Sequence, residues 1–152
     1  MPRNRVPGSR VQHHVTTFPT DRHQLIYRDA CLHAGHTDDD LRRARRRGEI
    51  VAVVRGAFVA TADRTPEEVH RLHVVATHEL GLVTSGVLSH QSAAVIHQLG
   101  LLLPDLSRVH VTSDGAAHGG RTAARHDHVG PVPPDEIVIV DGVPVTSLEW
   151  TA

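Results

Sequence analysis

Hydrophobic residues recur along this chain with helical spacing at first and with strand spacing towards its end. Two short helical patterns come first, at residues 28–34 and 41–47. Thr37 is suited to cap the second helix. The three acids at 38–40 are favourably placed in its first turn, where the helix dipole is positive. Gly48 follows as a typical C-terminal glycine, so the sequence predicts two helices joined by a tight turn.

A hairpin and a longer helix are expected next. Residues 49–60 are rich in valine and are interrupted at Gly56, which predicts two short strands. The longest helix begins after Thr65, because Pro66 suits the first helical position and Glu68 completes a capping box. The apolar face of this helix is expected to consist of Val69, Leu72, Ala76 and Leu80.

The rest of the chain predicts one more helix and then strands. Ser89 is expected to cap a helix that runs to Leu99 and closes at Gly100. From Ser107 onward the apolar spacing is two, which is typical of half-buried strands. The expected strands are 108–112, 122–128, 136–140 and 143–147, with an Asp-Gly turn at 141–142. The fold class is therefore α+β.

Composition narrows the class of protein. The chain has 152 residues, 39% of them hydrophobic and 22% charged, as in globular proteins. Its one cysteine, Cys31, excludes an internal disulfide and a multi-cysteine zinc site, and suits a reducing compartment. Neither a transmembrane run nor a secretory signal is visible in the sequence. We therefore expect a cytoplasmic protein without a membrane partner.

The formal charge of −1 hides a division between two parts of the chain. Residues 1–60 hold eleven arginines and six acids, a net charge of +5, whereas residues 61–152 hold five arginines and eleven acids, a net charge of −6. The lack of lysine and the fourteen histidines indicate codon bias, so a single arginine or histidine carries little weight. Codon bias does not sort charges, and the division indicates that the first part meets a polyanion.

Residues 28–48 have the layout of a helix-turn-helix. Gly35 is placed as the turn glycine, and Cys31, four positions earlier, is small enough for the two helices to cross closely. The apolar positions that would hold the pair together are Ala30, Ala34, Leu41 and Ala44. His36 fits its apolar position poorly. The hairpin at 49–60 follows where a winged helix-turn-helix has its wing.

The second helix carries five arginines, which can neutralise phosphates and grip guanine edges in the major groove. On a helical wheel Arg46 lies opposite the core, with Arg42 and Arg43 beside it. Arg45 and Arg47 lie nearer the core boundary. The candidate DNA-binding residues are Thr37, Arg42, Arg43, Arg45, Arg46, Arg47 and, at the tip of the wing, Arg55. The alternative is a solvated basic helix with no DNA-binding role.

Four segments, in order, carry a resemblance to a known family. They are LIYRDACLHAGHTDDDLRRARRRGEIVAVVRGAFVA, VLSHQSAAVIHQLGL, RVHVT and IVIVDGVPVTS, and together they span roughly residues 25–147. The chain resembles the AbiEi-family antitoxins of type IV toxin–antitoxin systems, whose N-terminal domain is a DNA-binding winged helix. This resemblance implies binding to double-stranded promoter DNA, autorepression of the operon and a nucleotidyltransferase-like toxin as partner.

Three departures from the family pattern are present. The helix expected before Leu25 is poorly formed, Gln98 stands where the family signature has glycine, and the chain ends at Ala152, where relatives continue. Many of those relatives continue into a Vsr-like or restriction-type endonuclease domain. The expected organisation is a flexible arm at 1–21, a winged helix-turn-helix at 22–62 and an α+β second domain at 63–152, incomplete at its C-terminus.

Two further functions stay open from the sequence. One is the DNA-targeting leading part of a truncated endonuclease-family protein, and the other is a protein-interaction module without DNA binding. The chain has no GxSxG, P-loop or GxGxxG motif, and the pair Ser89-His90 alone does not define a hydrolase. We therefore expect that the protein is not an enzyme.

Histidines and the C-terminal residues complete the expectations. His126 and His128 fall on the same side of a strand, and the long helix carries three more histidines, His70, His73 and His78. Neither group makes a full ligand set, so we expect no metal and no cofactor. Residues 148–152 are too few for a helix that holds itself together, and Trp150 is expected to be exposed.

Overall fold

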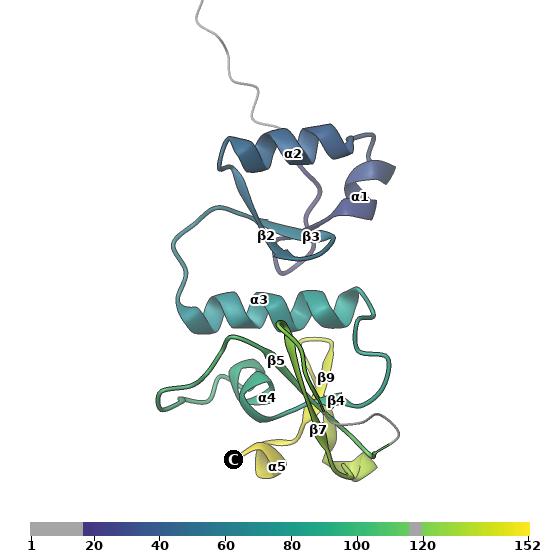
Figure 1. Ribbon diagram of the computed structural model, residues 1–152, viewed down its shortest axis with the longest axis vertical. Coiled ribbons are helices and arrows are strands. Elements are labelled where there is room, and N and C mark those ends of the chain that lie inside the picture. The colour runs from purple at the N-terminus through teal and green to yellow at the C-terminus, as the bar shows by residue number, and fades with distance from the viewer. Residues whose placement is uncertain (1–16, 116–119) are drawn as a thin grey trace, which may run out of the picture.

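The computed structural model describes residues 17–115 and 120–152 (Figure 1). Its elements are stacked along the long axis: α1 and α2, a three-stranded sheet, α3, and then α4 with a six-stranded sheet (Figure 1). The helices are α1 (Arg28–His33), α2 (Asp38–Arg46), α3 (Pro66–Glu79), α4 (His90–Ile96) and α5 (Leu148–Thr151), with a 3-10 turn at Pro134–Glu136. The strands are β1 (Leu25–Tyr27), β2 (Ile50–Val54), β3 (Ala57–Ala60), β4 (Val87–Leu88), β5 (Val109–Ser113), β6 (Gly120–Arg121), β7 (Arg125–Val129), β8 (Ile137–Val140) and β9 (Val143–Thr146). The fold is mixed α+β, as predicted.

The first sheet has the antiparallel order β1-β3-β2. The β2–β3 hairpin confirms the sequence prediction, but β1 was not expected: Leu25 pairs with Val59 and Tyr27 with Ala57. The helices α1 and α2 pack on one face of this sheet through Phe18, Ile26, Cys31, Leu41, Ala44, Ile50 and Phe58. None of the helices in the described part of the chain is both long and apolar enough to cross a membrane.

Two details of this first part differ from the sequence prediction. Phe18 belongs to the segment expected as an arm, yet it is buried and its ring lies 5.0 Å from that of His36. Residues 1–16 of that arm lie outside the described residues. Ala30 and Ala34 are exposed instead of holding the helix pair together; the residues of α1 and α2 in the core cluster are Cys31, Leu41 and Ala44.

Helix α3 packs against both sheets. Its N-terminus has the predicted capping box, in which Thr65 Oγ1 accepts from the Glu68 N–H and the Glu68 carboxylate accepts from the Thr65 N–H. Leu72 and His73 lie beside β2, whereas His70 and Val74 are buried on the other side. The predicted apolar face was therefore incomplete, and Val69, placed in it, is 42% exposed.

The second sheet has the order β6-β7-β5-β4-β9-β8, with parallel pairs β5–β7 and β4–β9. The predicted β8–β9 hairpin is confirmed, and Asp141 and Gly142 both have the positive φ angles (50° and 78°) that such a two-residue turn requires. The core of this half is continuous with that of the first half, because one cluster contains Leu25, Val74, Val111 and Val145.

Helix α4 is shorter than predicted, since it ends at Ile96 with His97 as its C-cap. Ser89 stands at the N-cap position, but its side chain caps no backbone N–H; its Oγ accepts a hydrogen bond from Thr112 Oγ1 at 2.7 Å. The expected capping role of the Ser89 hydroxyl is therefore wrong. Its hydroxyl is held by the buried strand β5 instead.

The residues after β9 form a helical turn, α5, that the sequence argument judged too short to persist. Ser147 Oγ accepts from the Trp150 N–H at 3.1 Å, and Thr151 Oγ1 lies 2.7 Å from Thr146 Oγ1. This capping and anchoring supply the stabilisation that an isolated turn lacks. Trp150 is 47% exposed, as expected.

Candidate nucleic-acid interface

The turn between α1 and α2 fixes the direction in which α2 presents its side chains. Gly35 has a φ of +90°, a left-handed conformation that glycine adopts at little cost. The His36 N–H then donates to the Cys31 carbonyl at 2.9 Å. Thr37 begins α2 with a capping box: its Oγ1 accepts from the Asp40 N–H, and the Asp40 carboxylate accepts from the Thr37 N–H. The Thr37 hydroxyl therefore serves the start of α2.

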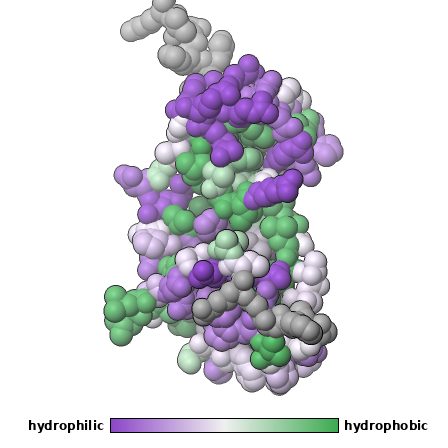
Figure 2. Space-filling model, viewed as in Figure 1, coloured by the Kyte–Doolittle hydropathy of each residue, from purple (hydrophilic) through white to green (hydrophobic). Residues whose placement is uncertain are grey.

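The five arginines of α2 and its C-cap are all exposed. Leu41 and Ala44 are buried beneath the helix, whereas Arg42, Arg43, Arg45, Arg46 and Arg47 are exposed. We call these five residues the α2 arginine face. In Figure 2 strongly hydrophilic side chains cover this end of the molecule.

Ion pairs neutralise much of the α2 arginine face. Arg42 pairs with Asp39, and Arg43 Nη2 lies 2.6 Å from Asp40 Oδ1. Arg47 binds the Glu49 carboxylate with two nitrogens, at 2.6 and 3.0 Å. In this way three of the five cations face an acid of their own chain.

A fourth arginine, outside α2, completes this arrangement of charges. Arg28, at the start of α1, donates two hydrogen bonds of 2.7 Å to Asp38. These bonds lower the pKa of the Asp38 carboxyl, and the hydrogen bonds from Thr37 lower the pKa of Asp40 to about 2. The acids are therefore ionised at neutral pH, and the N-terminal turn of α2 is close to neutral overall.

The positive charge that remains lies towards the C-terminal half of α2. Within the described residues, Arg45 and Arg46 form no ion pair; the Arg45 guanidinium lies 5.8 Å from the centre of the Phe58 ring. Arg42, Arg45 and Arg46 line a shallow groove whose other wall is the start of β2, Ile50 to Ala52. One wall of this groove is therefore positively charged and the other is apolar.

Arg55 lies apart from these residues, in the turn between β2 and β3. It is exposed and forms no ion pair among residues 17–115 and 120–152. The turn is anchored beside α1, because the Arg28 N–H donates to the Gly56 carbonyl at 2.9 Å. Sequence reasoning found the arginines but not their pairing, although the i,i+3 spacing of Asp39–Arg42 and Asp40–Arg43 carries that signal.

The histidines considered for metal binding have two different environments. His70 is buried, with Nδ1 3.0 Å from the Leu106 carbonyl oxygen and Nε2 3.0 Å from Ser92 Oγ. Both of its ring nitrogens are thus engaged within the fold. His126 and His128 lie beside a third histidine, His110 of β5. The sequence analysis did not predict that His110 would be near them.

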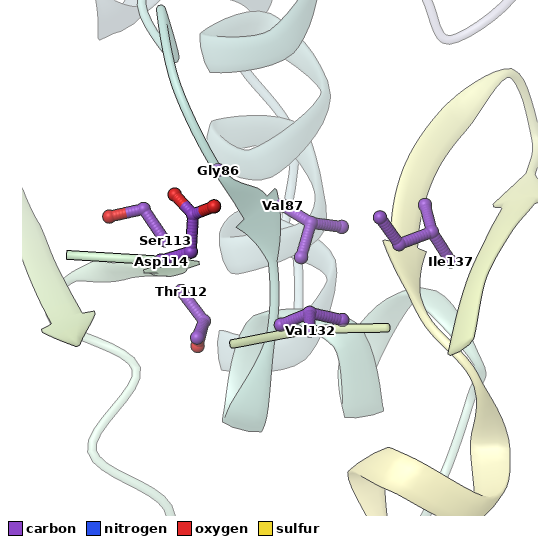
Figure 3. Close-up of a pocket in the computed structure, with 7 residues that line it drawn as sticks. All are labelled: Gly86, Val87, Thr112, Ser113, Asp114, Val132 and Ile137. Carbon is purple, nitrogen blue, oxygen red and sulfur yellow. The ribbon is translucent and has the colours of Figure 1, made fainter. Parts of the chain in front are cut away.

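A separate hollow lies between β4, the end of β5 and β8. Figure 3 shows Ser113 and Asp114 on one side and Val87, Val132 and Ile137 on the other. Among the described residues that line it, Asp114 has the one titratable side chain, and the Ser89-His90 pair is not part of the lining. Ser89 is only 1% exposed, so its hydroxyl is not accessible to a substrate.

Comparison of the chain with models of known protein families gives no match, and comparison with curated proteins gives none either.

Proposed function

We propose that this protein binds double-stranded DNA with the α2 arginine face, as a winged helix-turn-helix. The observation that carries the proposal is the exposure of all five arginines on a capped helix and its C-cap. Guanidinium groups on such a face can neutralise phosphates and can reach guanine edges in the major groove. The net charge of +5 in residues 1–60 favours the same partner.

The arrangement of charges suggests how α2 lies on the duplex. Arg45 and Arg46 have no ion pair in the described part of the chain, so they contact phosphates without first giving up an acid. Arg42 and Arg43 are held by Asp39 and Asp40, so in the unaltered chain they neutralise phosphates less fully than Arg45 and Arg46 do. Arg55, in the β2–β3 turn, contacts the backbone beside the groove, as the wing of such a domain does.

The biological setting follows from the resemblance described above. We propose an AbiEi-like antitoxin of the cytoplasm that represses its own operon. In this proposal the acidic second half of the chain, with a net charge of −6 over residues 61–152, meets a nucleotidyltransferase-like toxin. The protein itself performs no catalysis in this role.

The test is a titration of labelled DNA from upstream of its own gene with the full chain. Fluorescence anisotropy measures the affinity at salt concentrations between 50 and 200 mM. Arg46→Ala should weaken binding about tenfold, or about 1.4 kcal/mol, and reduce the slope of log K against log salt by about 0.9. Arg108→Ala is the matched control, because it removes the same charge from the second half of the chain. Arg108 directly precedes β5 and donates to the Thr122 carbonyl. Equal losses in the two variants would show that bulk charge, and not α2, holds the DNA.

A further inference from the structure

Four imidazoles gather on one side of the second sheet, in a group we call the histidine cluster: His90, His110, His126 and His128. Strands β5 and β7 are parallel neighbours, and their register places His110 opposite His126 and Thr112 opposite His128. Because successive strand residues alternate between faces, His126 and His128 share the face of His110. His90, the first residue of α4, stacks on His128.

Three members of the cluster approach the geometry of a metal site. One ring nitrogen from each of His110, His126 and His128 lies within 4.8 Å of the other two. The Nδ1 of His110 and the Nε2 of His128 are joined by a hydrogen bond of 2.9 Å, which a bound ion would replace. Nitrogens bound at about 2.0 Å in a tetrahedral zinc site lie about 3.3 Å from one another. Small side-chain rotations therefore suffice to converge on one ion.

The chemistry of the three side chains selects a class of ion. Imidazole nitrogen suits zinc, copper, nickel and iron, whereas calcium and magnesium prefer oxygen ligands. Asp127, between the two histidines of β7, lies on the opposite face and pairs with Arg125 at 2.9 Å.

We propose that His110, His126 and His128 bind one divalent first-row transition metal ion, with zinc as the reference ion. This replaces the expectation from the sequence that no metal site exists, because β5 supplies the third ligand that the pair on β7 lacked. The proposal does not depend on DNA binding, since the cluster lies on the second sheet, whereas α2 packs on the first through Leu41 and Ala44.

The fourth coordination position belongs to water in this arrangement. His90 lies outside the group whose nitrogens approach within 4.8 Å; its ring is stacked on His128 with centroids 3.8 Å apart. Its Nδ1 is 2.9 Å from Ser89 Oγ, and its φ of +49° is unusual for a residue other than glycine. His90 thus forms a wall of the site. The bound ion would join β5 to β7 directly.

The experiment uses the full chain without a polyhistidine tag. After treatment with chelator, zinc is titrated by calorimetry at pH 7.5, and cobalt is added separately as a spectroscopic probe. We expect one zinc per chain, a rise in the melting temperature that chelator reverses, and a four-coordinate cobalt spectrum. His110→Asn and His128→Asn should each weaken zinc binding at least about 100-fold, because loss of an outer-shell partner alone costs 10- to 100-fold.

His33→Asn is the control, because His33 is exposed on α1, where its Nδ1 lies 2.7 Å from the Asp29 carbonyl oxygen. Circular dichroism of the metal-free variants checks that they fold. Imidazole NMR of the unaltered chain gives a second reading that needs no variant: zinc should shift three histidine spin systems together. Absence of stoichiometric binding, or binding that survives His110→Asn and His128→Asn, would overturn the proposal.

Discussion

The ion pairs of α2 lead to a prediction opposite to the usual effect of mutating a DNA-binding helix: removing one of its side-chain charges should strengthen binding. Asp39 pairs with Arg42 on the exposed side of α2. Asp39→Asn keeps the size of the side chain, frees Arg42 for a phosphate and removes a negative charge that faces DNA.

The cost of this change to the fold should be small. The two side chains are 68% and 59% exposed, and ion pairs in such positions contribute about 0–1 kcal/mol. The lost favourable interaction of an acid with the first turn of the helix adds roughly 0.3–1 kcal/mol. A urea titration should therefore show a loss of about 1 kcal/mol in the free energy of unfolding.

The gain in DNA binding follows from counterion release. One additional neutralised phosphate raises the slope of log K against log salt by about 0.9, so the affinity lost between 50 and 200 mM salt grows by about 3.5-fold. Anisotropy titrations at both salt concentrations measure this slope directly. Asp135→Asn, in the 3-10 turn of the second half, changes the net charge equally and should leave the slope unchanged. If Asp39→Asn leaves the slope unchanged or lowers it, Arg42 does not reach the DNA.

Three other predictions concern the fold itself. Leu25→Ala empties a fully buried position of the shared core and should destabilise the chain by about 2–5 kcal/mol in urea unfolding, whereas Leu102→Ala, at a 92% exposed position, should change stability by less than about 0.5 kcal/mol. Burial lowers the pKa of His70, so the unfolded chain takes up a proton near pH 6.5 that the folded chain resists; stability should fall as pH drops from 7 to 5, and His70→Gln should make that fall shallower. Trp150, the only tryptophan, is 47% exposed and should show a water-like emission maximum that iodide quenches; a blue-shifted, protected signal would contradict this placement.

Local sequence chemistry predicted the elements whose ends are fixed by neighbouring residues. Thr65 with Glu68 located the start of α3, and the Asp-Gly pair at 141–142 located the β8–β9 turn. In each case the groups that decide the structure lie within four residues of one another. The exposed arginines of α2 were predicted for the same reason, since one helical turn sets the side on which each lies.

Features set by distant residues were not predicted. Leu25 becomes part of a strand because it pairs with Val59. A segment as short as Leu25–Tyr27 has no hydrophobic pattern that predicts this pairing. His110 meets His126 because β5 and β7 are parallel neighbours in one register, a fact absent from the spacing of either strand. The second buried side of α3 was missed because His70, a polar residue, occupies it. Its hydrogen bonds to Leu106 and Ser92 make that burial favourable.

Helix α3 restricts how the sequence of this protein can change. Leu72 and His73 face the first sheet while His70 and Val74 face the second half, so the rotational phase of one helix serves two interfaces. A single residue inserted in α3 would rotate everything after it by about 100°, because a helical turn holds 3.6 residues. The residues after the insertion would then leave the interface they occupy now, whichever of the two sheets they face. An insertion in α3 would therefore disrupt packing against both sheets. Substitutions on one side of the helix must keep the position of the helix that the other side requires.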